Sequence, residues 1–146
     1  MAEVLEEASR PYEGFDSYFD FISAEYERKR NDLVESLIAA EFRPILPEGG
    51  FFIVADTSAH SFPETFALQP GPTGVSPVSR DWALARWLTC DIGVTPIPPS
   101  AFYTSERAHL AANLARFAFC KSDDTLVEGK KRLTALGEAV RTRNSR

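Results

Sequence analysis

Arg116 is the polar side chain with the clearest chemical potential, because it interrupts the otherwise apolar run Leu-Ala-Arg-Phe-Ala-Phe-Cys at 114–120. Alternation along a strand places Phe117 and Phe119 on the core face, opposite Arg116. Its small neighbour Ala118 leaves room for a cleft beside the guanidinium, a rigid bidentate donor suited to a carboxylate. The pattern indicates either a clamp for an acidic ligand or an internal ion pair with one of the 21 acidic residues.

Other reactive side chains do not assemble into a recognisable site. The two cysteines are expected to be reduced thiols, and the two histidines have no partner at metal-ligand spacing. The hydroxyl groups near the proline-rich segments have no visible base, which argues against a hydrolase triad. These side chains are Cys90, Cys120, His60, His109, Ser58, Ser100 and Tyr103. The unusual segment 97–103 either walls a pocket or is a rigid loop packed on the core.

Length and composition indicate a single globular domain. The chain has 146 residues, 44% of them apolar, and a formal net charge of −5. The longest apolar run is the five residues 51–55, far short of the roughly 20 that a membrane-spanning helix needs. The net acidity argues against a nucleic-acid partner, and no secretory signal is recognisable, so we expect a cytoplasmic protein, although a mitochondrial one is also possible.

The elements that must position Arg116 follow from periodicity. Residues 1–14 are expected to be a loose lead-in, followed by a long helix from 15 to about 41, where Pro44 prevents continuation. Two extended segments flank the turn at 47–50, which predicts a hairpin, and the apolar run at 51–56 suggests burial on both faces.

The second half of the chain is predicted to hold two helices and the strand with Arg116. Residues 59–79 are rich in proline and glycine and are read as an inserted surface loop. A helix over 80–91 is followed by an extended segment at 94–98 and a short helix at 105–113. Ser122 then caps a last helix that ends near 140, before a tail at 141–146. The inner apolar stripe of this helix is expected to consist of Leu126, Leu133, Leu136 and Val140. The order predicts an α+β fold, a small, mainly antiparallel sheet covered by helices and preceded by the long helix.

Four blocks of sequence carry a family resemblance. They are Tyr-Glu-Arg-Lys-Arg-Asn-Asp-Leu at 26–33, Pro-Glu-Gly-Gly-Phe-Phe-Ile-Val-Ala-Asp at 47–56, Gly-Val-Thr-Pro-Ile-Pro-Pro-Ser-Ala-Phe-Tyr at 93–103 and Ala-Arg-Phe-Ala-Phe-Cys-Lys at 115–121. In this order they resemble the small C-terminal domain of class I/II aminotransferases, fold-type I enzymes that depend on pyridoxal phosphate. The resemblance is greatest to kynurenine aminotransferases, also known as glutamine transaminase K or cysteine-S-conjugate β-lyase, and places the small domain at 15–140.

The resemblance implies a role for Arg116 and a missing partner domain. In the family, the arginine of the Arg-Phe-x-Phe strand grips the α-carboxylate of the substrate, and Arg116 falls on that position. Phe51 and Phe52 match an apolar pair behind the glycine turn, one of which could line the substrate pocket, although core packing is the expectation that we favour. The family's large domain supplies the lysine that binds pyridoxal phosphate and mediates dimerisation. No lysine of this sequence has the family's Ser-x-x-Lys context, so we expect that the large domain is absent, that the cofactor is not anchored, and that the chain alone is inactive.

Two functions are therefore considered. In the first, the chain is part of an aminotransferase that moves an amino group from kynurenine- or glutamine-type amino acids to a 2-oxo acid, as a homodimer in full-length form. In the second, it is a stand-alone, non-catalytic module that pairs with an intact aminotransferase subunit or binds carboxylates weakly. Neither function involves nucleic acid or a membrane.

Overall fold

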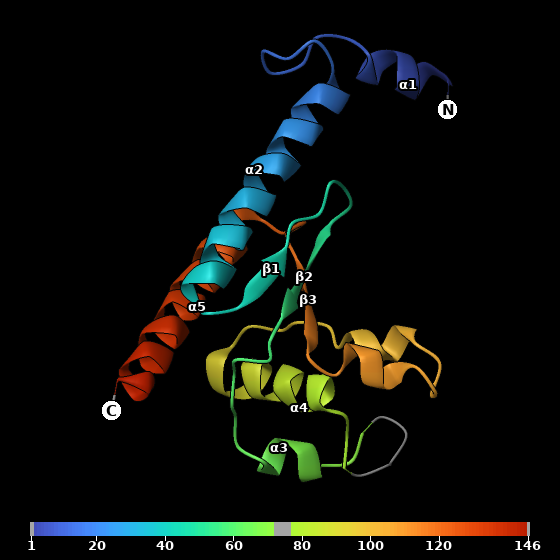
Figure 1. The fold of residues 1–146 in the computed structure, drawn as a ribbon. Helices are drawn as coiled ribbons and strands as arrows, with labels where there is room; N and C mark the ends of the chain where they lie inside the picture. The colour runs from blue at the N-terminus through green and yellow to red at the C-terminus, as the bar shows by residue number, and fades with distance from the viewer. Residues whose placement is uncertain (1, 72–76, 146) are drawn as a thin grey trace.

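The computed structural model describes residues 2–71 and 77–145. Its elements, in chain order, are α1 (Ala2–Ala8), α2 (Tyr18–Ala39), β1 (Arg43–Ile45), β2 (Phe52–Asp56), α3 (Thr65–Leu68), α4 (Arg80–Trp87), the π-helical turn η1 (Leu88–Ile92), the 3₁₀ turns η2 (Pro99–Phe102) and η3 (Ala108–Ala111), β3 (Leu114–Ala118) and α5 (Asp123–Asn144). Figure 1 shows α2 and α5 along one side of the sheet, with α4 and α3 below it. The predicted α+β class is confirmed.

The sheet has three antiparallel strands in the order β1-β2-β3. On one face, Ile53 lies opposite Phe117 and Ala55 opposite Ala115, and all four side chains are buried. The other face is only half-buried and carries Arg116, opposite Val54. The expectation that β2 is buried on both faces is therefore wrong, because the helices cover only one of them.

Helices α2 and α5 lie side by side and run in the same direction. Near their first halves, Arg28 Nη2 lies 2.9 Å from Asp123 Oδ1, and near their ends Arg141 Nη1 donates to the Ala39 carbonyl at 3.0 Å. Between these contacts the backbones approach so closely that a Cβ on Gly137 would lie 1.9 Å from the Ala39 carbonyl oxygen. Glycine is therefore required at 137, although it lowers helix propensity.

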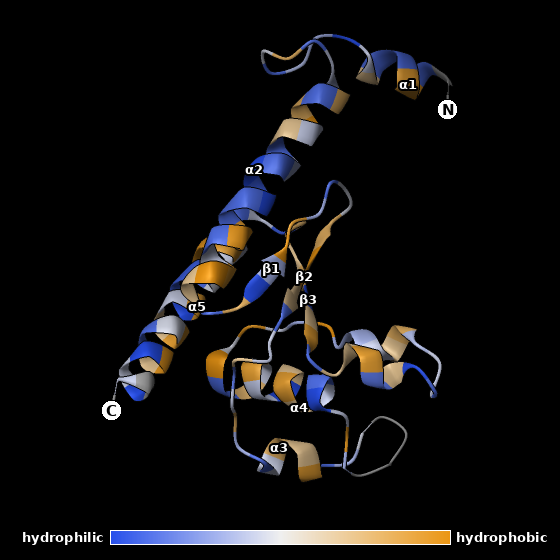
Figure 2. Cartoon of the chain, viewed as in Figure 1, coloured by the Kyte–Doolittle hydropathy of each residue, from blue (hydrophilic) through white to orange (hydrophobic). Residues whose placement is uncertain are grey.

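The core forms where these helices and α4 meet the buried face of the sheet. Figure 2 shows the resulting pattern, with β2 and β3 largely hydrophobic and the middle of α2 hydrophilic. The apolar stripe predicted for the last helix is confirmed for Leu133, Leu136 and Val140, which are all buried. Ser122 caps α5 by accepting from the Thr125 amide, as predicted.

The N-terminal region differs from the prediction. Residues expected to form a loose lead-in include the helix α1, and α2 begins at Tyr18, capped by Ser17. The first turns of α2 extend beyond the sheet, with α1 at their far end (Figure 1). Local helix formation in α1 was not visible in the sequence because its apolar residues lack a clear period.

The central region also contains structure that periodicity did not indicate. The expected surface loop at 59–79 holds the short helix α3, while residues 72–76 of it lie outside the described part of the chain. The helix predicted over 80–91 widens into η1 after Trp87 and ends at Gly93 with φ of 78°. The helix expected at 105–113 is only the 3₁₀ turn η3. Across the described residues, no helix is both long enough and apolar enough to cross a bilayer.

Candidate functional site

The guanidinium of Arg116 lies between two phenylalanine rings. Its Cζ is 4.2 Å from the ring centroid of Phe52 and 4.3 Å from that of Phe102. Phe52 belongs to β2, which pairs with one edge of β3. Phe102 lies five residues after Ile97, which pairs with Arg116 at the opposite edge of β3. The two rings therefore flank the guanidinium from opposite sides and contact it by cation–π interaction.

The charge of Arg116 is not neutralised by the described part of the chain. Within 2–71 and 77–145, no carboxylate lies within ion-pair distance of its guanidinium, and its buried Nε has no hydrogen-bond acceptor. A buried donor without a partner is costly, so it points to an acceptor supplied from outside the described residues. Of the two sequence interpretations, the internal ion pair is therefore not observed.

Arg116 also lines a groove that opens beside β3. The groove has a volume of about 720 Å³ and runs between the extended segment after η1 and the first half of α5, with Val94, Ile97, Ala118, Lys121 and Glu128 among its walls. The small side chain of Ala118 leaves this space open, as the sequence predicted. Phe52 and Phe102, which contact the guanidinium, are not part of the described groove lining, so the groove adjoins Arg116 beside these rings.

The turn that carries Phe102 is held by a buried acid. Asp81, in the first turn of α4, is fully buried, and its Oδ2 accepts from the Ser100 amide at 2.9 Å. Its Oδ1 accepts from the Ser79 hydroxyl, which lies 3.4 Å from the Ser100 hydroxyl. The sequence segment 97–103 is thus both a rigid loop, at its buried Pro99 and Ser100, and a wall of the Arg116 site, at Phe102.

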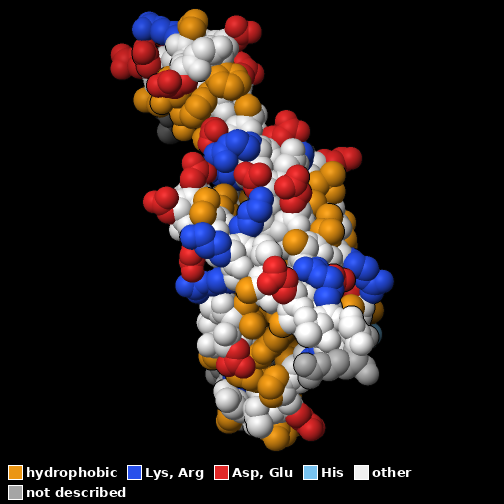
Figure 3. Space-filling model, turned by 90° about the vertical axis from the view of Figure 1, so that its left-hand side faces the viewer, with side chains coloured by type: hydrophobic (Ala, Val, Ile, Leu, Met, Phe, Trp, Pro, Cys, Tyr) orange, Lys and Arg blue, Asp and Glu red, His pale blue; other side chains and the backbone are white. Residues whose placement is uncertain are grey.

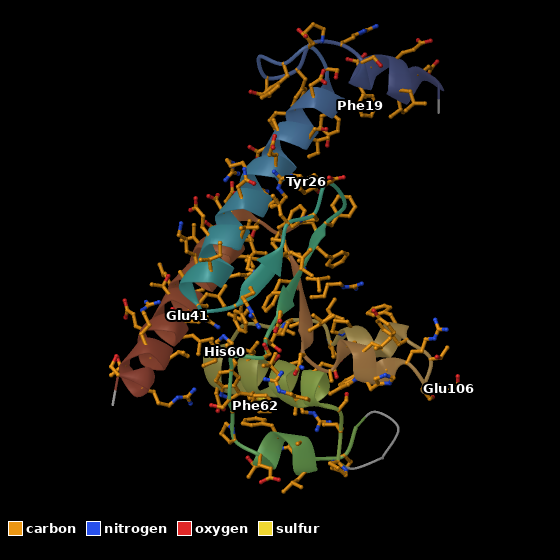
Figure 4. The ribbon with its side chains drawn as sticks, viewed as in Figure 1. Phe19, Tyr26, Glu41, His60, Phe62 and Glu106 are labelled. Carbon is orange, nitrogen blue, oxygen red and sulfur yellow. The ribbon has the colours of Figure 1, made fainter. Side chains whose placement is uncertain are left out.

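A second arginine organises the region below the sheet. Arg80 donates to the hydroxyl and carbonyl of Thr57 and to the carbonyl of His60, at 2.7–2.9 Å. The His60 ring is 4% exposed and stacks on Phe42 with ring centroids 4.0 Å apart. Figure 4 shows His60 between Glu41, which follows the end of α2, and Phe62, which lies on the α3 side of α4. This cluster attaches the predicted surface loop to the core.

Burial lowers the pKa of His60. The backbone carbonyls of Ala40 and Glu41 oppose this shift, while the charge of Arg80 and, more weakly, that of Arg143 reinforce it. Although those carbonyls lie nearby, neither ring nitrogen of His60 makes a hydrogen bond among the described residues. A neutral, buried imidazole fits this apolar environment.

The structure corrects the expectation for Phe51 and Phe52. Core packing was predicted for this pair, but Phe51 is 48% exposed and packs edge-on against Tyr26, at a centroid distance of 5.2 Å. Phe52 is half-buried against Arg116 instead. Phe52 lies outside the buried core because the inward positions of β2 are taken by Ile53 and Ala55, and Phe51 because it precedes β2, at the end of the turn. Of the residues around Arg116, sequence reasoning missed Asp81, for which the only signal was its place in a helical first turn.

Comparisons with known proteins identify relatives of this chain. A kynurenine–oxoglutarate transaminase of Dictyostelium discoideum is 40% identical over 119 residues, which are 82% of this chain and 27% of that protein. Among solved structures, Bna3p of Saccharomyces cerevisiae, proposed to be a kynurenine aminotransferase, superposes with a TM-score of 0.72 and 32% identity over 83% of this chain and 28% of that one. N-succinyldiaminopimelate aminotransferase of Mycobacterium tuberculosis gives 0.58 and 28% identity, over 79% and 25%. No family model matches the chain.

These relatives are aminotransferases, the class of enzyme that the sequence resemblance indicated. The chain is homologous to the kynurenine-type transaminases, and its fold is that of the small C-terminal domain of fold-type I aminotransferases. It spans about a quarter of the length of the relatives it matches.

Proposed function

We propose that this chain serves as the small-domain part of a pyridoxal-phosphate-dependent aminotransferase and that Arg116 binds the α-carboxylate of the substrate. The amino donor would be a kynurenine- or glutamine-type amino acid and the acceptor a 2-oxo acid. Support comes from the homologous transaminases and from the guanidinium that the fold leaves without a carboxylate. The single observation that carries the proposal is the buried, unpaired Nε of Arg116 between two rings.

The role of Arg116 in such a reaction is to hold and orient. A guanidinium whose two faces are covered by Phe52 and Phe102 presents its edge, and an edge-on carboxylate accepts two parallel hydrogen bonds from it. Fixing the carboxylate fixes the adjacent Cα and thereby lowers the entropic cost of aligning it with a catalytic base. The rings also exclude water from the guanidinium faces, which strengthens its attraction for an anion.

We propose that pyridoxal phosphate is not anchored by the lysines of this chain. The cofactor, when bound to an enzyme, acts as the electron sink of transamination. Here Lys29 donates to the Lys121 carbonyl at 3.0 Å, Lys131 lies 3.8 Å from Glu128, and Lys130 lies 4.0 Å from Glu35 of α2. Only Lys121 lines the groove of Arg116. We therefore propose that the chain alone is inactive and that other parts of the enzyme, which is a homodimer in full-length form, bind the cofactor.

Carboxylate binding tests the role of Arg116 directly. The ¹⁵N-labelled chain is titrated with sodium acetate, with sodium chloride at equal ionic strength as the reference. We expect saturable shifts of the backbone amides of Ile97 and Ala118 that are lost in Arg116→Met. The control Arg107→Met changes an exposed arginine and should keep the response. Saturable shifts that survive in Arg116→Met would contradict the assignment.

The stand-alone module is a second candidate because one surface of the chain is apolar and exposed. At the N-terminal end of α2, Tyr12, Phe15, Tyr18 and Phe19 are each at least 39% exposed. Figure 3 shows hydrophobic side chains gathered where this end projects from the body, and Figure 4 places Phe19 there. Co-sedimentation with an intact kynurenine-type aminotransferase tests pairing. Loss of pairing in Phe19→Ser, but not in Val127→Ser on α5, would favour this module.

A further inference from the structure

Asp81 is placed to control Arg116 although it lies in a different element. Its side chain is fully buried at the start of α4 and accepts from the Ser100 amide at 2.9 Å. Ser100 is the second residue of η2, the turn that ends with Phe102. Because Phe102 lies 4.3 Å from the Arg116 Cζ, one buried acid connects α4 to the guanidinium through a single short turn.

The turn packs against η3 and follows Ile97, whose backbone pairs with that of Arg116, but few hydrogen bonds among the described residues fix the turn itself. The Phe102 side chain is 64% exposed, so its ring gains little from burial and stays over Arg116 only if the backbone places it there. Two weak turn contacts hold that backbone, the Ala101 amide to the Pro98 carbonyl at 3.4 Å and the Tyr103 amide to the Ser100 carbonyl at 3.1 Å. The buried bond from Ser100 to Asp81 is shorter than either of them.

Asp81 itself is held at both of its oxygens. Oδ1 accepts from the hydroxyl of Ser79, the residue before α4, while Oδ2 is directed at η2. The first turn of a helix also favours an acidic side chain through the helix dipole. The acid therefore has a defined orientation, which a flexible surface residue would lack.

We propose that Asp81 is a positioning residue for Arg116 and acts through the turn that carries Phe102. It holds η2 so that the Phe102 ring covers the face of the guanidinium opposite Phe52, which sets the plane in which Arg116 receives a carboxylate. The expected effect of Asp81 on ligand binding rests on the proposed function of Arg116. The positioning itself is independent of any ligand.

The side-chain ¹⁵Nε–¹Hε resonance of Arg116 reports the positioning. An aromatic ring stacked on a guanidinium shifts the resonance of its protons, so Phe102→Leu should remove the contribution of one ring. We expect Asp81→Ala to move the resonance in the same direction, and the double variant to match Phe102→Leu alone. Asp81→Asn, which keeps an acceptor oxygen for the Ser100 amide, should restore most of the original shift.

Controls separate positioning from general stability. Asp91→Ala removes an exposed acid just after α4 and should leave the Arg116 resonance unchanged. If Asp81→Ala does not fold, Ser79→Ala frees only the Oδ1 side of Asp81 and should give a smaller shift in the same direction. The proposal is wrong if folded Asp81→Ala, or Ser79→Ala in its place, leaves the Arg116 resonance where it is in the parent chain.

Acetate titration of the same variants measures the consequence for binding. Loss of one cation–π contact should weaken acetate binding about fivefold in Phe102→Leu and in Asp81→Ala, with recovery in Asp81→Asn. If acetate does not bind the parent chain, the proposed function of Arg116 fails, while the resonance shifts still decide whether Asp81 positions the turn. If acetate binds all variants equally, Asp81 has no role in ligand binding.

Discussion

Arg80 and Arg116 are both half-buried arginines stacked on phenylalanine, yet their surroundings differ. Arg80 lies 5.5 Å from the Phe62 ring and donates to three oxygens of Thr57 and His60. Arg116 lies against two rings and has no acceptor for its buried Nε among the described residues. One guanidinium is satisfied by the fold and the other is not.

The difference teaches how to separate a structural arginine from a binding one. Residue type, burial and aromatic stacking are shared by the two sites, so none of them distinguishes the roles. The distinguishing feature is the number of acceptors that the fold itself supplies. Thr57 and His60 supply three acceptors to Arg80, whereas the half-buried face of the sheet offers Arg116 apolar rings and open space.

Removing each guanidinium in turn gives the largest expected contrast. Arg80→Met removes the Arg80 donors of the Thr57 hydroxyl and the His60 carbonyl and one of the two donors to the Thr57 carbonyl, so it should lower the free energy of unfolding by about 2 kcal/mol. Arg116→Met removes a charge that has no carboxylate partner in the described part of the chain, so it should change this free energy by less than about 1 kcal/mol in either direction. Urea denaturation followed by circular dichroism measures both. Equal losses would remove the distinction between the two arginines.

The two sites also differ in how far the sequence predicted them. Arg116 could be predicted because strand alternation is a local signal. Phe117 and Phe119 were expected on the core face, which placed the Arg116 side chain on the opposite face of the sheet. The same kind of signal located α5, through Ser122 and its apolar stripe, and the hairpin, through its glycine turn. These features depend on residues that are near one another in the chain.

The acceptors of Arg80 carried no such signal. Thr57 and His60 lie in a loop without periodicity, and they meet Arg80 only because α4 folds back under the sheet. The same holds for Phe102, whose position over Arg116 depends on the bridge between Ile97 and β3. Segment 97–103 was recognised as unusual, but its orientation is a tertiary property that pattern and spacing do not contain.

Shortening each stacked ring is the next test. Phe62 is partly buried and stacks on Trp87 at a centroid distance of 5.9 Å, so Phe62→Leu should cost about 1 kcal/mol of stability. Phe102 is 64% exposed, and Phe102→Leu should cost only about 0.3 kcal/mol. Thermal unfolding of the two variants provides the measurement. A larger loss in Phe102→Leu would mean that this ring stabilises the fold instead of serving Arg116.

Acidification should weaken the Arg80 region selectively. Burial is the main cause that lowers the pKa of His60 in the folded chain below its ordinary value of 6.5. As the pH falls, the unfolded chain therefore takes up a proton at this residue before the folded chain does. The stabilising contribution of the neutral ring is therefore complete above pH 6.5 and declines as the pH falls through the folded-state pKa. The melting temperature between pH 7.5 and 5.5 should fall less in His60→Leu than in the parent chain.

A matched histidine makes the pH experiment specific. His109 is exposed and its Nδ1 lies 2.9 Å from the Glu106 carbonyl oxygen, so His109→Gln should retain the pH dependence of the parent chain. Loss of that dependence in His109→Gln, or its persistence in His60→Leu, would show that burial of His60 is not its source.

The smallest expected effect is stabilisation by a carboxylate, and it separates the two arginines most directly. An anion that binds only the folded chain should raise its unfolding free energy by about 0.6 kcal/mol when present at twice its Kd. Arg80 donates three hydrogen bonds to Thr57 and His60, whereas the guanidinium of Arg116 makes none among the described residues, so of these two arginines Arg116 is the better placed to bind acetate. We therefore expect acetate to raise the melting temperature of the parent chain slightly relative to chloride, and to have no such effect on Arg116→Met. Comparable stabilisation of that variant would mean that acetate acts elsewhere on the molecule, and that an unpaired guanidinium between two rings is not sufficient to make a carboxylate site.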